Sequence, residues 1–579
     1  MRCTINSHEQ VMSFADLLNS VGEAGRFQVI HVILLVLAKL LFPGHNLIQN
    51  FSAATPRHHC RVPWLENASL EARRDSPWNL SNTTLLRVAM PWEENSPSRC
   101  SRYVRPQWQL MYNNSTDLSN HGEIEGCLDG WEFDTSMFSS TIVTEWDLVC
   151  EEKVMKQMAQ SVYMAGLLVG AIILGGLADK FGRRTILLIS YLGLAVSGCC
   201  AAFAPSMAVY TAARFFDGMF MSGAALNSFS LGLEWMSVKN RVLYSLASGC
   251  AYTTGQIILA GFAYAIRDWR YLQLAVSAPF FLIVFIGMLH VESARWLIFK
   301  GRYDDALKCF KKVARINGKR VVLNMEILKR ELEDDFVGET KTYTIFDLVR
   351  TATLRKRTFT IFFIWFATAF SYYGLALNLQ GFKVNIYLLM VLFGLVDYPS
   401  KFAGLLTANY IGRRAAQMAS LSLAGFTSVA LIFISEDMAI LRASLAVLGK
   451  GFLGCAFNIV YLFTGELFPT VMRQTSVGAG STMARVGAML APLVIHSGEI
   501  YPVLPQIIYA VVCLCAGLVA LMLPETRNTN LPDTVDDLLQ QQKRRKEQQM
   551  KSQSISDERE NSTSLEVLAT ARPDVTSAQ

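Results

Sequence analysis

The stretch GGLADKFGRR, residues 175–184, is a short connection between two long apolar runs. Its cations Lys180, Arg183 and Arg184 favour the cytosolic side of a membrane, because short cytosolic loops are enriched in Lys and Arg. Part of the stretch recurs much later, where Gly-Arg413-Arg414 repeats Gly-Arg183-Arg184 after 230 residues. The connection therefore orients two membrane spans and points to a duplicated chain.

Two further signatures repeat in the same order. Glu234-x6-Arg241 returns as Glu466-x6-Arg473 after 232 residues. Val-Glu292-Ser-Ala-Arg295 returns as Pro-Glu525-Thr-Arg527 after 233 residues. Three signatures at a nearly constant displacement predict two parallel halves of six helices each, the architecture of a duplicated transporter.

Composition supports a polytopic membrane protein. The 579 residues are 52% hydrophobic and only 17% charged, which is not the composition of an ordinary soluble globule. The net charge of +6 follows the loops and reports orientation rather than a nucleic-acid partner. Runs long enough to cross a bilayer predict an all-α protein with twelve spans: 26–48, 157–178, 185–205, 207–231, 242–265, 270–290, 358–379, 384–410, 415–435, 438–463, 474–496 and 502–523.

The polar segments complete the predicted domain organisation. Residues 1–25 lack a signal-peptide pattern, so we expect a cytosolic N-terminus before the first half, residues 26–290. The basic segment 291–357 is predicted to be a cytosolic central loop with a helix from Tyr303 to Arg315. The second half covers 358–523, and the charged residues 524–579 predict a disordered cytosolic tail.

The long polar loop 51–155 has the features of an extracellular segment. Its glycosylation sequons are Asn67, Asn79, Asn82, Asn113 and Asn114. It also carries Cys60, Cys100, Cys127 and Cys150, an even number in a compartment where disulfides persist. We predict two disulfides, and the sequence leaves their connectivity open.

A fixed positive charge lies midway along the eleventh apolar run, in GAGSTMARVGAMLAP, residues 478–492. Arg485 would stand near the bilayer centre, where inserting it costs roughly 2.5–3.5 kcal/mol. The run holds no acidic residue, and Gly480, Ala484 and Ala488 form a small-residue stripe that lets another helix approach. We predict that Arg485 faces a cavity and binds anions. The alternative is an ion pair with a neighbouring helix that only holds the bundle together.

The first span contains a second unusual cation, Lys39, followed by Phe42-Pro-Gly-His-Asn46, which should loosen the helix towards its outer end. Lys39 has three open roles: it can snorkel, pack against another helix or face the pore.

The repeated loops suggest a conformational latch. Paired Arg and Glu residues at the mouths of helices can form interlocking ion pairs and cap helix C-termini. Rocking of the two halves would then require the pairs to break and form again. The alternative is that these residues only anchor the topology. The predicted latch residues are Asp179, Arg183, Arg184, Glu234, Arg241, Glu292, Arg295, Arg413, Arg414, Glu466, Arg473 and Glu525.

Several motifs together resemble one family. GGLADKFGRR, the large first loop, STIVTEWDLVC (140–150), ESARWL (292–297), LAVLGKG (445–451), TGELFPT (464–470) and LPETRN (523–528) are similar to the organic anion transporter branch of solute carrier family 22, in the major facilitator superfamily. The resemblance covers essentially residues 12–540. It implies the major facilitator fold and an anion rather than a cation as substrate.

The resemblance also implies individual site residues. Arg485 and Lys401 match two pore cations of the branch. The matching aromatic and polar positions are Tyr252, Tyr372, Tyr373, Phe457 and Asn46. Tyr461 stands where relatives commonly have Phe, Phe42 stands where a Met is frequent, and Lys39 has no counterpart that we recognise.

The same residues form a plausible site on physical grounds alone. Phe457 and Tyr461 lie on one helical face, so aromatics from several helices can enclose an apolar body while Arg485 and Lys401 meet its anionic end. Two cations favour a ligand with two anionic ends, which would make Lys401 the residue that selects doubly charged partners. The rival is a simple pair of Lys401 with Asp397, four residues earlier.

We therefore predict a plasma-membrane carrier, with both termini cytosolic, that moves amphipathic small organic anions by alternating access. The resemblance implies exchange for an intracellular dicarboxylate such as 2-oxoglutarate. The alternatives are a carrier of steroid sulfates, urate or zwitterions without such exchange, or a receptor or scaffold that does not transport. No GxxxxGK[ST] loop and no metal-ligand spacing of histidines is present, so we expect no enzyme activity, cofactor or metal.

Overall fold

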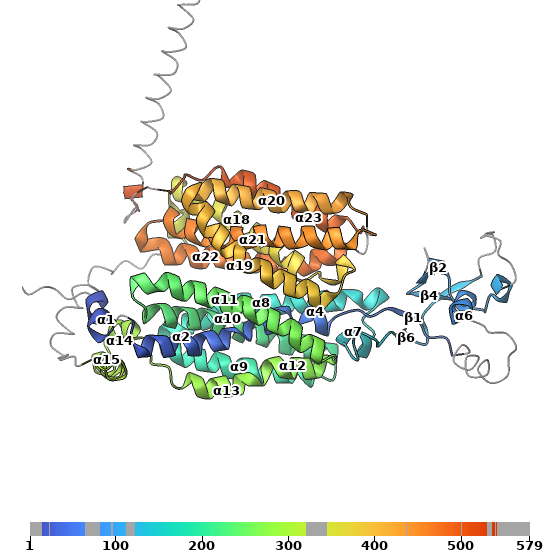
Figure 1. The fold of residues 1–579 in the computed structure, drawn as a ribbon, viewed down its shortest axis with the longest axis horizontal. Coiled ribbons are helices and arrows are strands. Elements are labelled where there is room, and N and C mark those ends of the chain that lie inside the picture. Colours follow the sequence, from blue (N-terminus) through green and yellow to red (C-terminus); the bar gives the residue numbers. More distant parts are fainter. Residues whose placement is uncertain are drawn as a thin grey trace, which may run out of the picture.

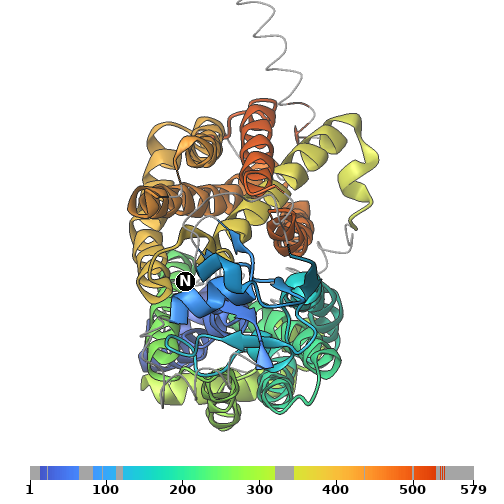
Figure 2. The ribbon, with the colours of Figure 1, turned by 90° about the vertical axis from the view of Figure 1, so that its right-hand side faces the viewer.

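The computed structural model describes residues 14–22, 24–63, 82–93, 96–111, 122–319, 344–435, 437–498, 501–527 and 529, together with 535, 537, 538 and 540. Its long helices form two groups that lie side by side, the N-terminal half below and the C-terminal half above in Figure 1. We call the end next to residues 53–153 the loop end, and the end that carries Gly182 and Gly412 the arginine end. Seen from the loop end, the two halves remain distinct groups (Figure 2).

The N-terminal half consists of six spans, two of which are interrupted. Its helices are α2 (Arg26–Lys39), α3 (Phe42–Leu47), α4 (Gln49–Ser52), α8 (Val154–Phe181), α9 (Arg183–Ala202), α10 (Met207–Glu234), α11 (Val238–Ala265), α12 (Trp269–Ser277) and α13 (Pro279–Gly287).

The C-terminal half consists of six continuous helices that start and end close to the predicted boundaries. They are α18 (Ala352–Ala376), α19 (Ile386–Tyr410), α20 (Arg413–Phe433), α21 (Ala439–Leu467), α22 (Arg473–Ser497) and α23 (Leu504–Ala520). All twelve predicted spans thus contain helix. Among the described residues, nine helical segments are long and apolar enough by themselves to cross a membrane.

The first span breaks where the sequence predicted loosening. Helix α2 ends at Lys39, and α3 begins at Phe42 with Pro43 in its first turn, where a missing N–H costs nothing. Gly255 of α11 fits against this break, because a Cβ there would lie 2.0 Å from the Leu40 carbonyl oxygen. The break therefore depends on a glycine in a different helix.

The loop between α4 and α8 forms a small subdomain beyond the membrane-spanning helices (Figure 1). Disulfides join Cys60 to Cys127 and Cys100 to Cys150. Its short antiparallel strand pairs are β1 (His58–Cys60) with β6 (Trp131–Phe133), β2 (Trp92–Glu93) with β3 (Ser96–Pro97), and β4 (Ser101–Tyr103) with β5 (Ile124–Gly126). The remaining elements are α6 (Asn82–Ala89), η1 (Trp108–Met111), α7 (Ile142–Glu145) and η2 (Cys150–Lys153).

Short helices gather at the arginine end (Figure 1). Helix α15 (Tyr303–Asn317) covers the predicted helix, and it packs beside α1 (Phe14–Gly22) and α14 (Ala294–Phe299). The Asn317 side chain joins these segments, since it accepts from the Phe27 N–H at 2.8 Å and donates to the Val21 carbonyl at 3.0 Å. The central segment also contains α17 (Asp347–Arg350), and η3 (Gln380–Phe382) and η4 (Thr470–Met472) complete the short elements.

The prediction of an unstructured tail from residue 524 is wrong at its beginning. Glu525 bonds to the start of α20, and Leu538 is only 1% exposed within the core of the C-terminal half. A few apolar residues in a charged segment were enough to bury part of it. The rest of the tail lies outside the described residues.

Candidate functional site

Arg485 lies in the middle of α22, and its charge has no acidic partner among the residues that the structure describes. Its guanidinium donates to the carbonyl and hydroxyl oxygens of Ser481 at 3.0 and 2.8 Å. In the described ranges no carboxylate oxygen lies within 4.0 Å of it. The alternative of an ion pair that holds the bundle together is therefore not realised in this conformation.

Aromatic side chains from two helices surround this charge. Tyr373 of α18 and Tyr461 of α21 lie within electrostatic range of the guanidinium. The ring of Tyr461 packs edge-on at 4.4 Å, centroid to centroid, against Trp365 of α18. Tyr461 is nevertheless 48% exposed. Rings from two helices thus lie beside Arg485, and the ring of Tyr461 is accessible.

The other predicted aromatics extend this lining. Tyr372 lies edge-on to Phe457 at 5.3 Å and to Tyr373 at 5.5 Å. Trp365 also contacts Phe457, at 6.5 Å. The stripe on α22 makes this packing possible, because a Cβ at Gly480 would lie 2.5 Å from the Trp365 indole nitrogen. Its member Ala488 instead contacts Tyr163 of α8, so α22 packs against both halves.

The N-terminal half contributes a hydrogen-bonded polar group. The Asn46 amide donates to the Tyr252 hydroxyl at 3.0 Å and accepts from the Tyr163 hydroxyl at 2.6 Å. This arrangement ties α3, α8 and α11 together. Asn46 and Tyr252, which the sequence proposed as separate site residues, therefore contact each other, and Tyr163 is an additional partner.

Lys401 does not pair with Asp397, and that predicted rival is corrected. The Lys401 ammonium donates to the hydroxyl of Thr253 in α11, while Asp397 accepts from Lys450 of α21 at 2.8 Å. Although Asp397 lies one helical turn before Lys401, packing turns its carboxylate towards α21. Lys401 is therefore a half-buried cation with a neutral partner.

The Asp397–Lys450 pair is a buried charge pair in the C-terminal half. The Lys450 side chain has no exposed surface, and its ammonium also donates to the Phe393 carbonyl at 2.7 Å. It lies 5.0 Å from the centroid of the Tyr372 ring, whose hydroxyl donates to Asp397 at 3.3 Å. The pair thus holds Tyr372, one of the lining aromatics, in place.

The N-terminal half buries a comparable group. Asp217 of α10 accepts from Arg214 at 2.7 Å and lies 2.8 Å from His45 Nδ1 of α3. All three side chains are fully buried, and the Arg214 guanidinium lies 4.1 Å from the centroid of the Tyr163 ring. Arg214 is therefore neutralised inside its own half.

The central membrane region consequently carries an excess of positive charge. Its carboxylates, Asp217 and Asp397, are each occupied by a cation. Three cations hydrogen-bond only to neutral partners in the described part of the chain: Arg485, Lys401 and Lys39. Asp397 still attracts Lys401 from beyond hydrogen-bond distance. An uncompensated charge in a membrane interior is costly, and a bound anion offsets part of that cost. This excess of positive charge favours an anion as the ligand of the central region.

The halves meet at the loop end and near the middle of the bundle. Asn50 donates to the Ala376 carbonyl at 2.9 Å, and the rings of Phe51 and Tyr387 stack at 5.5 Å. Nearer the centre, the hydroxyls of Thr254 and Tyr398 lie 2.6 Å apart. The contacts of Asn50 and Phe51 join the two halves at the loop end. Tyr461, which lies nearer the arginine end of α21, is exposed.

The predicted latch residues form one equivalent cluster in each half. Arg183 pairs with Asp179 at 3.0 Å and with Glu234 at 3.3 Å. In the second half, Arg413 forms two 2.9 Å bonds to Glu466. Both arginines also reach a helix C-terminus as predicted, at the carbonyl of Ala178 (3.4 Å) and of Ala408 (3.2 Å).

The repeated glycine has a physical explanation. Gly182 and Gly412 adopt φ values of 103° and 107°, which favour glycine. The carboxylates of Glu292 and Glu525 occupy the space of their missing Cβ atoms. From there Glu292 accepts from the Arg184 N–H, and Glu525 accepts from the Arg413 and Arg414 N–H groups, at 2.9–3.0 Å. Each carboxylate thus caps the N-terminus of a helix.

The latch expectation needs two corrections. The ion pairs join helices of the same half, so rocking of the halves does not by itself break them in this conformation. The Glu-x6-Arg spacing also does not form a direct pair, because Arg241 donates to the Met236 carbonyl instead. Arg295 is exposed, and two buried guanidinium nitrogens of Arg473 have no partner among the described residues. A role of these residues in switching remains a prediction.

Glu525 should make the protein sensitive to acid. Burial alone would raise the pKa of its carboxyl, but four backbone N–H groups, those of Arg527, Arg413, Arg414 and Thr526, outweigh burial and hold the pKa below its usual value. A lowered pKa means that this stabilisation is complete above about pH 4.3, the ordinary glutamate pKa, and is lost as the pH falls through the folded-state value.

We therefore expect the melting temperature of the detergent-solubilised protein to fall between pH 5 and pH 3, roughly the range of such carboxyl titrations, and to fall less in Glu525→Gln. Intrinsic fluorescence measures the transition, and replacement of the exposed Glu151 by Gln is the control. Equal acid sensitivity of the wild type and Glu525→Gln would contradict this role.

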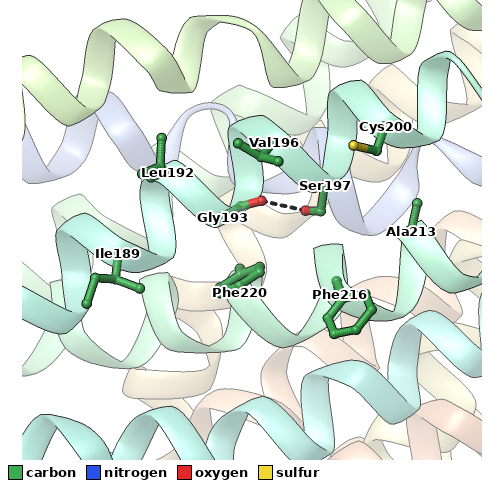
Figure 3. Close-up of a pocket in the computed structure, with 9 residues that line it drawn as sticks. All are labelled: Ile189, Leu192, Gly193, Val196, Ser197, Cys200, Ala213, Phe216 and Phe220. Carbon is green, nitrogen blue, oxygen red and sulfur yellow. Dashed lines mark hydrogen bonds between the residues drawn. The ribbon is translucent and has the colours of Figure 1, made fainter.

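A different pocket lies on the flank of the N-terminal half, between α9 and α10 (Figure 3). It contains no charged group, and its one hydroxyl, on Ser197, donates to the Gly193 carbonyl at 2.6 Å within the same helix. Such a surface suits acyl chains rather than anions. The lining residues are Ile189, Leu192, Gly193, Val196, Ser197, Cys200, Ala213, Phe216 and Phe220.

The predicted glycosylation sites lie mostly outside the described residues. Asn67, Asn79, Asn113 and Asn114 lie outside the described residues, and Asn82 begins α6 without a described side chain. Trp365, Lys450 and Arg214 were not among the site residues predicted from the sequence. For the last two a signal existed, since each is a cation within an apolar run.

Comparisons with known proteins agree with this architecture. The Major Facilitator Superfamily profile matches residues 136–492. Solute carrier family 22 member 6 of Oryctolagus cuniculus is 47% identical over 531 residues, which are 91% of this chain and 94% of the relative. Solute carrier family 22 member 6-B of Xenopus laevis is 46% identical over 532 residues, 91% and 95% of the two chains.

Solved structures show the same fold at low sequence identity. The inward open conformation of the xylose transporter XylE from E. coli has a TM-score of 0.54 and 13% identity, covering 86% of this chain and 97% of that chain.

Proposed function

Because this chain belongs to the major facilitator superfamily and, within it, to solute carrier family 22, we propose that it carries amphipathic organic anions across the plasma membrane by alternating access. The chain is a transporter rather than an enzyme. The observation that carries the proposal is the charge balance of the central region, where Arg485, Lys401 and Lys39 lack acidic partners in the described structure. A carrier of cations would instead need an excess of negative charge in this region.

The lining explains the preference for amphipathic substrates. Tyr373, Tyr461 and Phe457 offer ring surface to an apolar body, and Arg485 presents a planar fork of N–H donors to a carboxylate or sulfate. Binding to both parts orients the ligand with its anionic group towards α22. Neutral or cationic molecules of the same shape lack the partner for Arg485.

The arrangement of the halves supports an inward-facing state. We place the loop end outside the cell, because its subdomain carries two disulfides and the sequons. Contacts between the halves at that end close the outer entrance. Transport then requires these contacts to open while the opposite end closes.

Exchange for an intracellular dicarboxylate such as 2-oxoglutarate is the finer part of the proposal. It rests on the resemblance and on the presence of more than one uncompensated cation. Carriage of a steroid sulfate, urate or a zwitterion without exchange is the alternative. A receptor or scaffold that does not transport would have no use for the excess charge.

Uptake of a labelled aromatic carboxylate into vesicles that contain the purified protein tests both parts. We expect uptake that preloaded dicarboxylate accelerates, and a preloaded uncharged amide serves as the control. Uptake without acceleration would support the carrier but contradict exchange, and no uptake would contradict transport.

The extracellular position of the loop makes a separate prediction. Replacing Asn67, Asn79, Asn82, Asn113 and Asn114 together by Gln should lower the apparent mass of the protein from mammalian cells and reduce its delivery to the surface. Substrate affinity of the molecules that arrive should change little, because the loop lies beyond the central site. Gel mobility with and without glycosidase measures the shift, and an unchanged mass would contradict glycosylation of this loop.

A further inference from the structure

Tyr163 of α8 is a fully buried tyrosine beside the central region. Its hydroxyl donates to the side-chain oxygen of Asn46 at 2.6 Å. The Arg214 guanidinium lies 4.1 Å from the centroid of its ring, and Asp217 holds that guanidinium in place at 2.7 Å. The tyrosine is therefore fixed at its ring by α10 and at its hydroxyl by α3.

The backbone at Asn46 is held by neighbouring helices. Arg214 donates to the carbonyl of His45 at 3.0 Å, and the Gln160 side chain donates to the carbonyl of Asn46 at 3.3 Å. With its backbone fixed, the side-chain amide of Asn46 can face its neighbours in two ways, related by a half-turn about its last bond. Either its oxygen faces Tyr163 and its N–H group faces Tyr252, or the reverse.

The burial of Tyr163 decides between these two orientations. A buried hydrogen-bond donor without an acceptor is strongly disfavoured, and within the described part of the chain Asn46 supplies the acceptor for the Tyr163 hydroxyl. The tyrosine must donate to an oxygen, so the Asn46 oxygen faces Tyr163. The amide N–H group then faces Tyr252 and donates to its hydroxyl at 3.0 Å.

This orientation determines what Tyr252 offers to a ligand. A tyrosine hydroxyl carries a single hydrogen, and because Tyr252 accepts from Asn46, that hydrogen remains for another acceptor. In the reversed orientation Tyr252 would donate to Asn46. It would then present only lone pairs to a ligand, and lone pairs repel an anion.

Tyr252 lies where its hydrogen can meet an anion. Its side chain is half-buried, and it lies within electrostatic range of Tyr373 in the C-terminal half. Tyr373 lies in turn within electrostatic range of Arg485. The Tyr252 hydroxyl therefore belongs to the same central region as the guanidinium, on the side that the N-terminal half provides.

We propose that Tyr163 is a positioning residue for anion selection: by fixing the orientation of the Asn46 amide, it keeps Tyr252 a hydrogen-bond donor towards the anionic ligand. The inference rests on the proposed function, and it adds a selecting group in the N-terminal half to Arg485 of the other half. Tyr163 itself touches no ligand, because it is fully buried. It acts only through the direction of two hydrogen bonds.

A double-mutant cycle tests this chain of hydrogen bonds, with binding of labelled benzoate to the purified full-length protein as the measurement. Tyr163→Phe keeps the buried ring but lets the Asn46 amide turn and take up the Tyr252 hydrogen. We expect it to weaken benzoate binding about fivefold, the effect of losing one ordinary hydrogen bond. Tyr252→Phe should weaken binding about tenfold or more, because its hydroxyl bonds to a charged ligand. The double variant should match Tyr252→Phe within about twofold, since Tyr163 acts through Tyr252.

Tyr210→Phe is the matched control. Tyr210 is also fully buried in the N-terminal half, and its hydroxyl donates at 3.1 Å to the side-chain oxygen of Gln49, three residues after Asn46. Both Tyr163→Phe and Tyr210→Phe remove one buried hydroxyl bound to an amide of the first span, so both should lower the melting temperature by a similar amount. Only Tyr163→Phe should lower the affinity for benzoate.

A loss in Tyr163→Phe that adds in full to the loss in Tyr252→Phe would overturn the inference, because Tyr163 would then act without Tyr252. Unchanged benzoate affinity in Tyr163→Phe, or an equal loss in Tyr210→Phe, would overturn it as well. If the wild-type protein does not bind benzoate, the proposed function fails instead, so the two failures are distinguishable.

Discussion

Arg485→Ala is expected to reach the cell surface in normal amounts and to lose organic-anion uptake by about 100-fold or more, because a buried anion left without its charged partner loses several kcal/mol. The guanidinium makes its hydrogen bonds to Ser481 in its own helix, so its removal leaves no unpaired carboxylate among the described residues. Folding should therefore not suffer. Surface biotinylation and uptake of a labelled aromatic carboxylate measure the two quantities separately.

Two variants refine the interpretation of Arg485. Arg485→Lys keeps the charge without the planar fork and should recover only part of the uptake. Ser481→Ala keeps the whole guanidinium but removes one of its acceptors. It should therefore raise the KM for uptake and leave surface delivery nearly unchanged. Failure of Arg485→Ala to fold or to reach the surface would show that the arginine holds the bundle together and would count against an anion site.

Removing one member of the Asp397–Lys450 pair is expected to cause the largest loss of folded protein. The Asp397 side chain is 8% exposed and the Lys450 side chain is fully buried, so either single replacement leaves an unpaired charge in the membrane interior. Breaking a buried pair in this way costs about 3–5 kcal/mol. We expect Asp397→Asn and Lys450→Met each to reduce sharply the monodisperse peak in fluorescence-detected size-exclusion chromatography.

The double replacement Asp397→Asn with Lys450→Met should restore much of this peak, because neutral residues of similar volume leave no charge unpaired. The matched control is Asp397→Asn with Lys401→Met. Since Lys401 bonds to Thr253 rather than to Asp397, this combination should remain as unstable as Asp397→Asn alone. Rescue by the Lys401 replacement, and not by the Lys450 replacement, would contradict the pairing seen in the structure.

The sequence alone determined the architecture. Long apolar runs predicted the spans because a bilayer core requires about 20 apolar residues per helix, and the repeated GRR, Glu-x6-Arg and Glu-Arg signatures predicted two equivalent halves. The break after Lys39 was predictable from Pro43 and Gly44, and Arg485 was recognisable as a site residue because an arginine within an apolar run needs a reason. These features are local or periodic, so they can be recognised in a single sequence without its tertiary structure.

Only the tertiary structure decided which charges remain available. Asp397 precedes Lys401 by one helical turn but bonds to Lys450, which is 53 residues away. Asp217 pairs with Arg214 and also contacts His45 on a different helix. Helix rotation and crossing set these choices, and they depend on packing contacts such as Gly480 against Trp365 and Gly255 against the Leu40 carbonyl. A sequence shows which charges enter the membrane. Which of them are neutralised, and which remain for a ligand, depends on how the helices face one another.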